Sequence, residues 1–198
     1  MNSPITLASG SASRQSLLKG AGIVADAIKS GVDEDALKDQ MRGAELTVAQ
    51  QAMRLAMEKA TAVSGSRPGL VIGGDQMLAL GARAFDKPIG IEGVKEHLKD
   101  LSGKTHILET AIVVAEDGEV IWEHLERPQL TMRELSDDFI DYYVGQVGTA
   151  VCDTVGGYQL EGLGVQLFSR IEGDYFSILG LPLLALLEFF RSHEVIEA

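Results

Sequence analysis

The stretch Leu7–Leu18, LASGSASRQSLL, predicts a strand, a tight loop and a helix in immediate succession. The strand is expected over Ile5–Ala8, and the helix over Arg14–Ala21, where Gly22 ends it. Serine and glycine in such a loop favour a turn and a helix cap. Small residues there also let an anion approach the free N–H groups of the helix N-terminus. The stretch therefore leaves two alternatives open, a turn with a cap or an anion site.

Outside this stretch, helices and strands alternate early in the chain, and the signal for a hairpin, Glu116–Glu119, stands in the middle. Further strands are expected at Val24–Ile28, Leu70–Ile72, Thr105–Ala115 and Val120–Leu130, and further helices at Thr47–Ser64, Glu92–Leu101, from Ser136 to Val144 and from Pro182 on. A pattern with both parallel crossovers and a hairpin predicts an α/β fold with a mixed, twisted sheet.

The composition indicates a soluble globular protein with one domain over residues 1–198. The hydrophobic fraction of 45% and the charged fraction of 23% are ordinary for that class. A net charge of −12 argues against broad nucleic-acid binding. Cys152 is the one cysteine, so no intramolecular disulfide forms and a reducing compartment fits. The sequence has no signal peptide or membrane span, and we expect a cytoplasmic protein without membrane partners.

Lys59 interrupts an apolar stripe on the helix predicted over Thr47–Ser64. The stripe consists of Val48, Ala52, Leu55, Ala56 and Val63, which recur at helical spacing. A lysine on a buried face is costly unless its ammonium finds a partner or reaches solvent. Lys59 is therefore expected either to extend along the helix to a carbonyl at its end or to carry its charge into a cleft, where it could meet phosphate.

Three carboxylates follow predicted strands, where a catalytic or metal site is possible. Asp75 follows the apolar strand Leu70–Ile72 and two glycines, so we expect it at the end of a central strand, where ligands of open α/β sheets bind. It is a turn residue, or else a general base or metal ligand. Asp33 and Glu34 follow the second strand and either hold a divalent cation or are simply solvated.

The sequence excludes several familiar sites. It contains no G-x-x-x-x-G-K-[ST] loop, no G-x-G-x-x-G, no G-x-S-x-G and no H-E-x-x-H. Its four histidines lack the spacing of zinc ligands. A small-residue loop with an arginine, lysines and several carboxylates remains, and this mixture suits a phosphorylated ligand, a hard metal ion and activated water.

A series of short motifs resembles one family. In chain order they are Leu7–Arg14 (LASGSASR), Val32–Glu34 (VDE), Glu58–Ala60 (EKA), Gly74–Gln76 (GDQ), Asp86–Pro88 (DKP), Leu101–His106 (LSGKTH), Val155–Gly162 (VGGYQLEG) and Ile171–Leu183 (IEGDYFSILGLPL). With these motifs the chain resembles the Maf family of nucleoside triphosphate pyrophosphatases, also described as septum formation inhibitor-like. Ala12 and Asp86 stand where the family has proline and glycine.

The resemblance implies a fold like that of Maf and inosine triphosphatase-like enzymes, with two lobes, a central cleft and a homodimeric state. It implies hydrolysis between the α and β phosphates of a nucleoside triphosphate, with a divalent cation, Mg²⁺ or Mn²⁺. The implied roles are water activation by Asp75, help with the metal or substrate by Glu34, and phosphate binding by a hydroxyl and three cationic side chains. Those phosphate-binding residues are Ser9, Arg14, Lys59 and Lys87.

Three further positions bear on the base. Ser13, Gln76 and Glu161 stand where the branch that acts on 7-methyl-GTP carries tryptophan, glutamine and glutamate. The chain therefore resembles that branch at two of three positions, and Ser13 lacks the ring that would stack on a base. A second hypothesis is a nucleotide-binding regulator of cell division or septum formation with little turnover.

Overall fold

Two long strands, β3 (Leu70–Leu80) and β5 (Thr105–Glu116), contribute to both of the compact units into which the chain divides. The computed structural model describes residues 3–197. The first unit comprises residues 3–76, 109–126 and 174–197, and the second comprises residues 77–108 and 127–173. Each unit is described by itself below.

The remaining elements alternate between strands and helices along the chain. The strands are β1 (Ile5–Leu7), β2 (Asp26–Ala27), β4 (Arg83–Phe85), β6 (Glu119–Glu126), β7 (Gln129–Met132) and β8 (Phe168–Glu172). The α-helices are α1 (Ala12–Gly20), α2 (Glu34–Gly43), α3 (Val48–Ser64), α4 (Gly90–Leu101), α5 (Asp137–Val147), α6 (Tyr175–Ile178) and α7 (Leu183–Ser192). Three 3-10 helices complete the set: η1 (Gly148–Asp153), η2 (Val155–Gly157) and η3 (Leu163–Leu167). The strands of the described residues form one sheet with parallel and antiparallel pairs, which confirms the predicted α/β fold with a mixed sheet.

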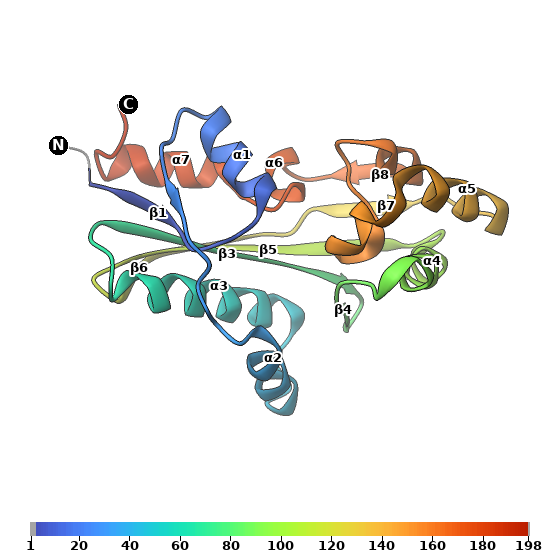
Figure 1. The fold of residues 1–198 in the computed structure, drawn as a ribbon, viewed down its shortest axis with the longest axis horizontal. Helices are drawn as coiled ribbons and strands as arrows, with labels where there is room; N and C mark the ends of the chain where they lie inside the picture. Colours follow the sequence, from blue (N-terminus) through green and yellow to red (C-terminus); the bar gives the residue numbers. More distant parts are fainter. Residues whose placement is uncertain (1–2, 198) are drawn as a thin grey trace. The chain divides into compact units, whose positions relative to one another are not determined.

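In the first unit, β1 is the centre of a parallel set. It pairs with β2, with Thr6 opposite Asp26, and with β3, with Leu7 opposite Ile72. The adjoining part of β5 forms the predicted antiparallel hairpin with β6. Helices α1 and α7 lie on one side of these strands and α3 lies on the other (Figure 1). The first unit is thus a sheet covered by helices on both faces.

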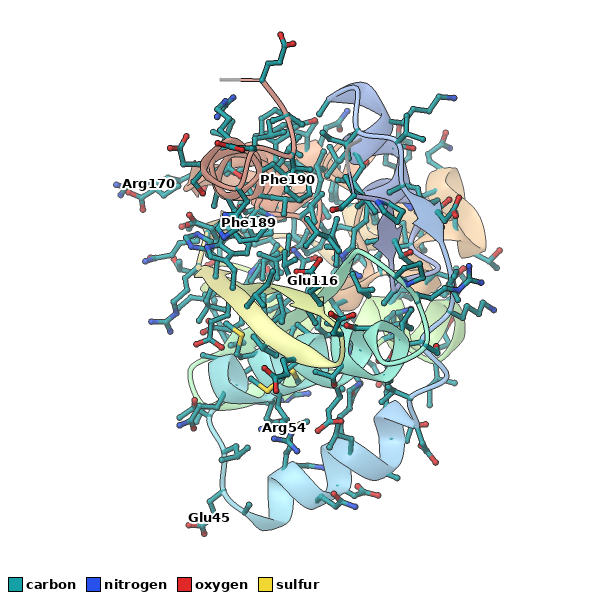
Figure 2. The ribbon with its side chains drawn as sticks, turned by 90° about the vertical axis from the view of Figure 1, so that its left-hand side faces the viewer. Glu45, Arg54, Glu116, Arg170, Phe189 and Phe190 are labelled. Carbon is teal, nitrogen blue, oxygen red and sulfur yellow. The ribbon has the colours of Figure 1, made fainter. Side chains whose placement is uncertain are left out.

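The main core of the first unit lies between the sheet and helices α1 and α7. Its buried side chains come from strands and helices alike and include Leu7, Leu18, Leu70, Ile72, Ile112, Val114, Leu186, Phe189 and Phe190. Figure 2 shows Phe189 and Phe190 on α7, and the Phe189 ring stacks on Trp122 of β6 at 5.0 Å between centroids. Burial of such rings supplies much of the hydrophobic stabilisation of this face.

Helix α3 forms by local signals and packs closely on β3. Thr47 and Gln50 make a capping box at its N-terminus, so the helix begins where the sequence predicts. A Cβ at Gly73 of β3 would collide with the Ala56 carbonyl oxygen and lie 2.7 Å from the Ala60 nitrogen. Gly73 therefore lets the backbones of α3 and β3 approach each other, and this approach brings Lys59 over the strand.

The second unit contains the α-helices α4 and α5, the three 3-10 helices and a group of aromatic side chains that contact His106 of β5. Strand β7 pairs antiparallel with β5 and with β8, and β4 pairs antiparallel with β3. His106 of β5 is fully buried, with its Nε2 2.7 Å from the Tyr158 hydroxyl oxygen and its ring beside Phe168. Burial lowers the pKa of His106 to about 4, so its imidazole is neutral at neutral pH.

Several predicted boundaries of strands and helices are wrong, because strand pairing or a helix cap sets the observed boundary. The expected strand Val120–Leu130 is two strands, β6 and β7, because Arg127 and Pro128 separate them and β7 pairs on the other part of β5. Helix α1 begins at Ala12 rather than at residue 14, because Ser11 caps it. The sequence reading also missed helices α2 and α6, which begin at aspartate caps, Asp33 and Asp174. Among residues 3–197, no helix is long and apolar enough to span a bilayer.

Candidate active site

Lys59 carries its ammonium into a cluster of carboxylates in the first unit. The side chain is 7% exposed, and its Nζ lies 2.7 Å from Asp75 Oδ1 and 2.9 Å from Glu34 Oε1. Of the two alternatives that the apolar stripe left open, extension along the helix to a carbonyl at its end is therefore wrong. The stripe itself explains the result, because the turn of α3 that carries Lys59 packs on β3 beside Gly73.

Asp75 lies in the middle of β3, and its expected place at the end of a strand is wrong. The parallel pairing of β1 with β3 ends where the Ala8 N–H donates to the Ile72 carbonyl oxygen, at 2.8 Å. Strand β3 continues through Asp75 because its later residues pair with another strand, β4. Asp75 is 7% exposed and lies three residues beyond Ile72, the last residue of β3 that pairs with β1.

Glu34 comes to Lys59 from the first turn of α2. The Asp33 carboxylate accepts a hydrogen bond from the Ala36 N–H at 3.0 Å and so caps this helix. Asp33 is therefore engaged as a cap, whereas the next residue, Glu34, turns its carboxylate to Lys59. The turn that leads from α2 to α3 contains Glu45, with a φ of 55°, at the end of α2 shown in Figure 2.

Arg14 is the second cation of the group. It lies in the first turn of α1 at 9% exposure, and its Nε donates to the Gly180 carbonyl oxygen at 2.7 Å. Burial lowers the pKa of its guanidinium, and the Asp75 and Glu34 carboxylates act in the opposite direction. Gly74 leaves room for this side chain, because a Cβ there would lie 3.2 Å from Arg14 Nε. Arg14, Glu34, Lys59 and Asp75 are called the charged cluster below.

The serines of the N-terminal loop support Arg14 and the helix. Ser9 Oγ accepts hydrogen bonds from the Ser11 N–H and from Arg14 Nη1, each at 3.2 Å. Ser11 Oγ accepts from the Arg14 N–H at 3.4 Å and caps α1. The turn and the cap predicted for this stretch are therefore present, and the anion site stays a prediction. The N-terminus of α1 and the Arg14 guanidinium lie together, which is the arrangement that an anion needs.

Gln76 follows Asp75 on β3 and belongs to the same unit. Its side-chain Nε2 donates to Thr110 Oγ1 at 2.8 Å and to the Ser177 carbonyl oxygen at 2.9 Å. The half-buried Gln76 amide is thus engaged with β5 and α6. Sequence reasoning missed Thr110, Ser177 and Gly180, because no local pattern marks a carbonyl oxygen that a distant residue will use.

Three predicted site residues outside the charged cluster are exposed. Ser13 is an exposed residue of α1, next to Arg14. Lys87 and Glu161 belong to the second unit, where both are exposed. Lys87 precedes the buried Pro88 between β4 and α4, and Glu161 lies in the turn between η2 and η3. Their roles stay predictions.

A hard divalent cation fits the donors of the charged cluster. Within residues 3–197 no group of three or more His, Cys, Asp or Glu side chains is arranged to hold a metal ion. Mg²⁺ is commonly held by only one or two carboxylates together with substrate phosphates and water. Glu34 and Asp75 supply two carboxylates that already converge on one positive charge, the Lys59 ammonium.

Comparison with known proteins identifies the family of this chain. Residues 4–193 match the family described as Maf-like protein. The chain is 60% identical over 196 residues, 99% of each chain, to the "Nucleoside triphosphate pyrophosphatase" of Hyphomonas neptunium. It is 48% identical over 190 residues to the protein of the same name of Caulobacter vibrioides, covering 96% of each chain. It is 46% identical over 193 residues to the "7-methyl-GTP pyrophosphatase" of Mesorhizobium japonicum, covering 97% of each chain. With a match over nearly its whole length and a charged cluster built from the family's motifs, this chain belongs to the Maf-like protein family.

Proposed function

We propose that this protein is a nucleoside triphosphate pyrophosphatase, which converts its substrate into a nucleoside monophosphate and pyrophosphate. The observation that carries the proposal is the charged cluster. It holds two cations, Arg14 and Lys59, against two carboxylates, Asp75 and Glu34. Cations bind the phosphates, and a carboxylate activates water. The names of the relatives support the same reaction.

In this reaction Asp75 accepts a proton from water, whose oxygen forms a bond to the α-phosphorus. The bond between that phosphorus and the oxygen that bridges to the β-phosphorus breaks, and its electron pair leaves with pyrophosphate. Lys59 donates a hydrogen bond to Asp75. When the ammonium turns to phosphate oxygens, the Asp75 carboxylate becomes available as a base.

Arg14 and the α1 N-terminus bind the phosphate chain, with Ser9 holding the guanidinium. Lys87 binds phosphate as a further cation. Glu34 and Asp75 would hold a divalent cation, Mg²⁺ or Mn²⁺, which neutralises phosphate charge when bound. We also propose that the protein is a homodimer, which light scattering during gel filtration tests.

The base is proposed to be of the guanine type, with 7-methyl-GTP as one candidate substrate. An ionised Glu161 only accepts hydrogen bonds, and a guanine edge is rich in N–H donors. The relative from Mesorhizobium japonicum that is named for 7-methyl-GTP supports this preference.

The test is a panel of nucleoside triphosphates, including 7-methyl-GTP, GTP, UTP and dTTP, with Mg²⁺ or Mn²⁺ and separate detection of pyrophosphate and orthophosphate. We expect equal amounts of monophosphate and pyrophosphate. Release of orthophosphate would contradict the proposal, and tight nucleotide binding without turnover would favour the division-regulator hypothesis. Lys87→Met is expected to raise KM in the same assay without changing thermal stability, because Lys87 is exposed.

A further inference from the structure

Gln76 makes three hydrogen bonds that a residue reading a base would not need. Its Nε2 donates to Thr110 Oγ1 at 2.8 Å, to the Ser177 carbonyl oxygen at 2.9 Å and to the Ile178 carbonyl oxygen at 3.2 Å. Carbonyl oxygens only accept, so the amide must turn its NH₂ group toward α6. The NH₂ group of Gln76 is thus occupied by the protein itself.

The Ser177 carbonyl oxygen, which accepts from Gln76, also binds the residues that follow α6. It also accepts from Thr110 Oγ1 at 3.0 Å and from the Gly180 N–H at 3.1 Å. Ser177 is fully buried, and its own N–H donates to the Asp174 carboxylate at 2.7 Å. The segment that follows α6 is therefore held at one atom by Gln76, Thr110 and Gly180.

Gly180 connects the Ser177 carbonyl oxygen to Arg14 of the charged cluster. Its N–H is bound to Ser177, and its carbonyl oxygen accepts from Arg14 Nε at 2.7 Å. Its φ of 103° is one that residues with a Cβ rarely adopt, so the direction of this carbonyl depends on glycine. The orientation of the Arg14 guanidinium depends in turn on where the Gly180 peptide lies.

We propose that Gln76 is a positioning residue, which aims Arg14 at the phosphate chain through Ser177 and Gly180. The inference rests on the proposed function, because it gives Gln76 a part in phosphate binding. On this proposal, substitution of Gln76 weakens binding of the phosphate chain. Substitution of a residue that contacts the base would change only the preference among nucleobases. A ligand without a base separates these two roles.

The experiment measures binding of inorganic tripolyphosphate to the full chain by calorimetry. Gln76→Glu replaces the NH₂ donor with a carboxylate that faces two carbonyl oxygens, and Gln76→Met removes the donor without adding charge. We expect both variants to lose about tenfold in tripolyphosphate affinity, as for one misplaced charge-assisted hydrogen bond. The matched control is Gln51→Glu, because Gln51 Nε2 also donates to a main-chain carbonyl, that of Leu46, at 2.7 Å. The control should bind tripolyphosphate like the parent protein.

Two further measurements separate positioning from a general loss of structure. In an Arg14→Lys background the ammonium cannot reproduce the Nε contact, so Gln76→Met should cause no further loss of tripolyphosphate affinity. Amide hydrogen exchange at Gly180 should be faster in Gln76→Met than in the parent and unchanged in Gln51→Glu.

Unchanged exchange at Gly180, unchanged tripolyphosphate affinity in both Gln76 variants, or additive losses with Arg14→Lys would each overturn the inference. Failure of the proposed function looks different. In that case the parent protein itself binds no tripolyphosphate and releases no pyrophosphate, whereas the exchange experiment still reports whether Gln76 holds Gly180.

Discussion

The Lys59 ammonium donates a 2.7 Å hydrogen bond to Asp75 Oδ1, although the two residues come from a helix and a strand and both are nearly buried. The proposed phosphate ligand and the proposed base are therefore hydrogen-bonded to each other. A buried carboxylate without a cation would be costly, so the pair also keeps the interior of the first unit stable before substrate arrives.

Asp75→Asn is expected to remove metal-dependent pyrophosphate release and to leave the fold intact. Asparagine retains an oxygen that accepts from Lys59 but cannot take a proton from water. Loss of a general base typically lowers the rate by about 10²–10⁴-fold. Single-turnover measurements on the preferred nucleotide check the rate, and a thermal unfolding scan serves as the control. Turnover within a few fold of the parent protein would rule out Asp75 as the base.

Lys59→Met is expected to lower both activity and stability. The change keeps an unbranched chain of similar size but leaves the Asp75 and Glu34 carboxylates facing each other without the ammonium. Breaking a buried pair from one side costs about 3 kcal/mol of unfolding free energy. Urea unfolding of Lys59→Met and of the double variant with Asp75→Asn checks this value. Stability should partly return in the double variant, and simple addition of the two effects would refute the coupling.

Gly73→Ala is expected to displace α3 from β3. The new methyl group would collide with the Ala56 carbonyl oxygen and lie 2.7 Å from the Ala60 nitrogen, and neither backbone atom can rotate away. We expect a loss of about 1–3 kcal/mol of unfolding free energy, together with lower activity as Lys59 moves. The matched control is Gly20→Ala in α1, where a Cβ meets nothing within 4 Å. A Gly73 variant as stable and active as the control would show that this close approach is unimportant.

Glu161→Gln is expected to shift base preference toward pyrimidines. Glutamine offers both a donor and an acceptor, which suits a uracil or thymine edge, whereas an acceptor that faces carbonyls is repelled. The ratio of kcat/KM for GTP or 7-methyl-GTP to that for UTP should fall by roughly tenfold, the equivalent of one exchanged hydrogen bond of ~1.4 kcal/mol. A parent protein that already prefers UTP or dTTP would contradict this role of Glu161.

His106 makes the stability of the protein fall on acidification. Its pKa is about 4 in the folded protein, below the ordinary value of 6.5, because burial disfavours the charged ring. The unfolded chain therefore binds more protons between these values, and stability decreases as pH falls from about 6.5 to about 4, by at most ~1.4 kcal/mol per pH unit. Urea unfolding at several pH values should show a shallower pH dependence for His106→Gln than for the parent. Equal slopes in both proteins would exclude His106 as the source.

Helix starts and turns that depend on a few neighbouring residues could be predicted from the sequence. Helix α3 begins directly after its cap Thr47, because a capping box acts over three residues, and it ends at the predicted Ser64. The turn between β5 and β6 places Asp117 and Gly118 at positive φ, which the Asp-Gly pair predicts. The Ser136 cap of α5 is of the same kind, with its hydroxyl oxygen accepting from the Phe139 N–H at 3.2 Å.

The site was accessible from the sequence only in part. The motifs named all four members of the charged cluster, but not the contacts among them. Periodicity placed Lys59 on the buried face of α3 without a partner, because its partners Asp75 and Glu34 come from other elements. Asp75 was expected at a strand end, because glycine weakens the interior of a strand and β5, the sheet neighbour of β3, begins only at Thr105.

By itself, the sequence determined the α/β class, the starts of α3 and α5, the hairpin and the set of charged residues, because periodicity, caps, turns and short motifs each depend on neighbours within a few positions. Tertiary structure alone decided that Lys59 joins Asp75, that the Gln76 amide turns to Ser177 and that Arg14 donates to Gly180. These contacts link residues that are 16, 101 and 166 positions apart. Packing of α3 on β3, and of the segment after α6 on the sheet, brings them within hydrogen-bond distance, and no local propensity encodes that packing.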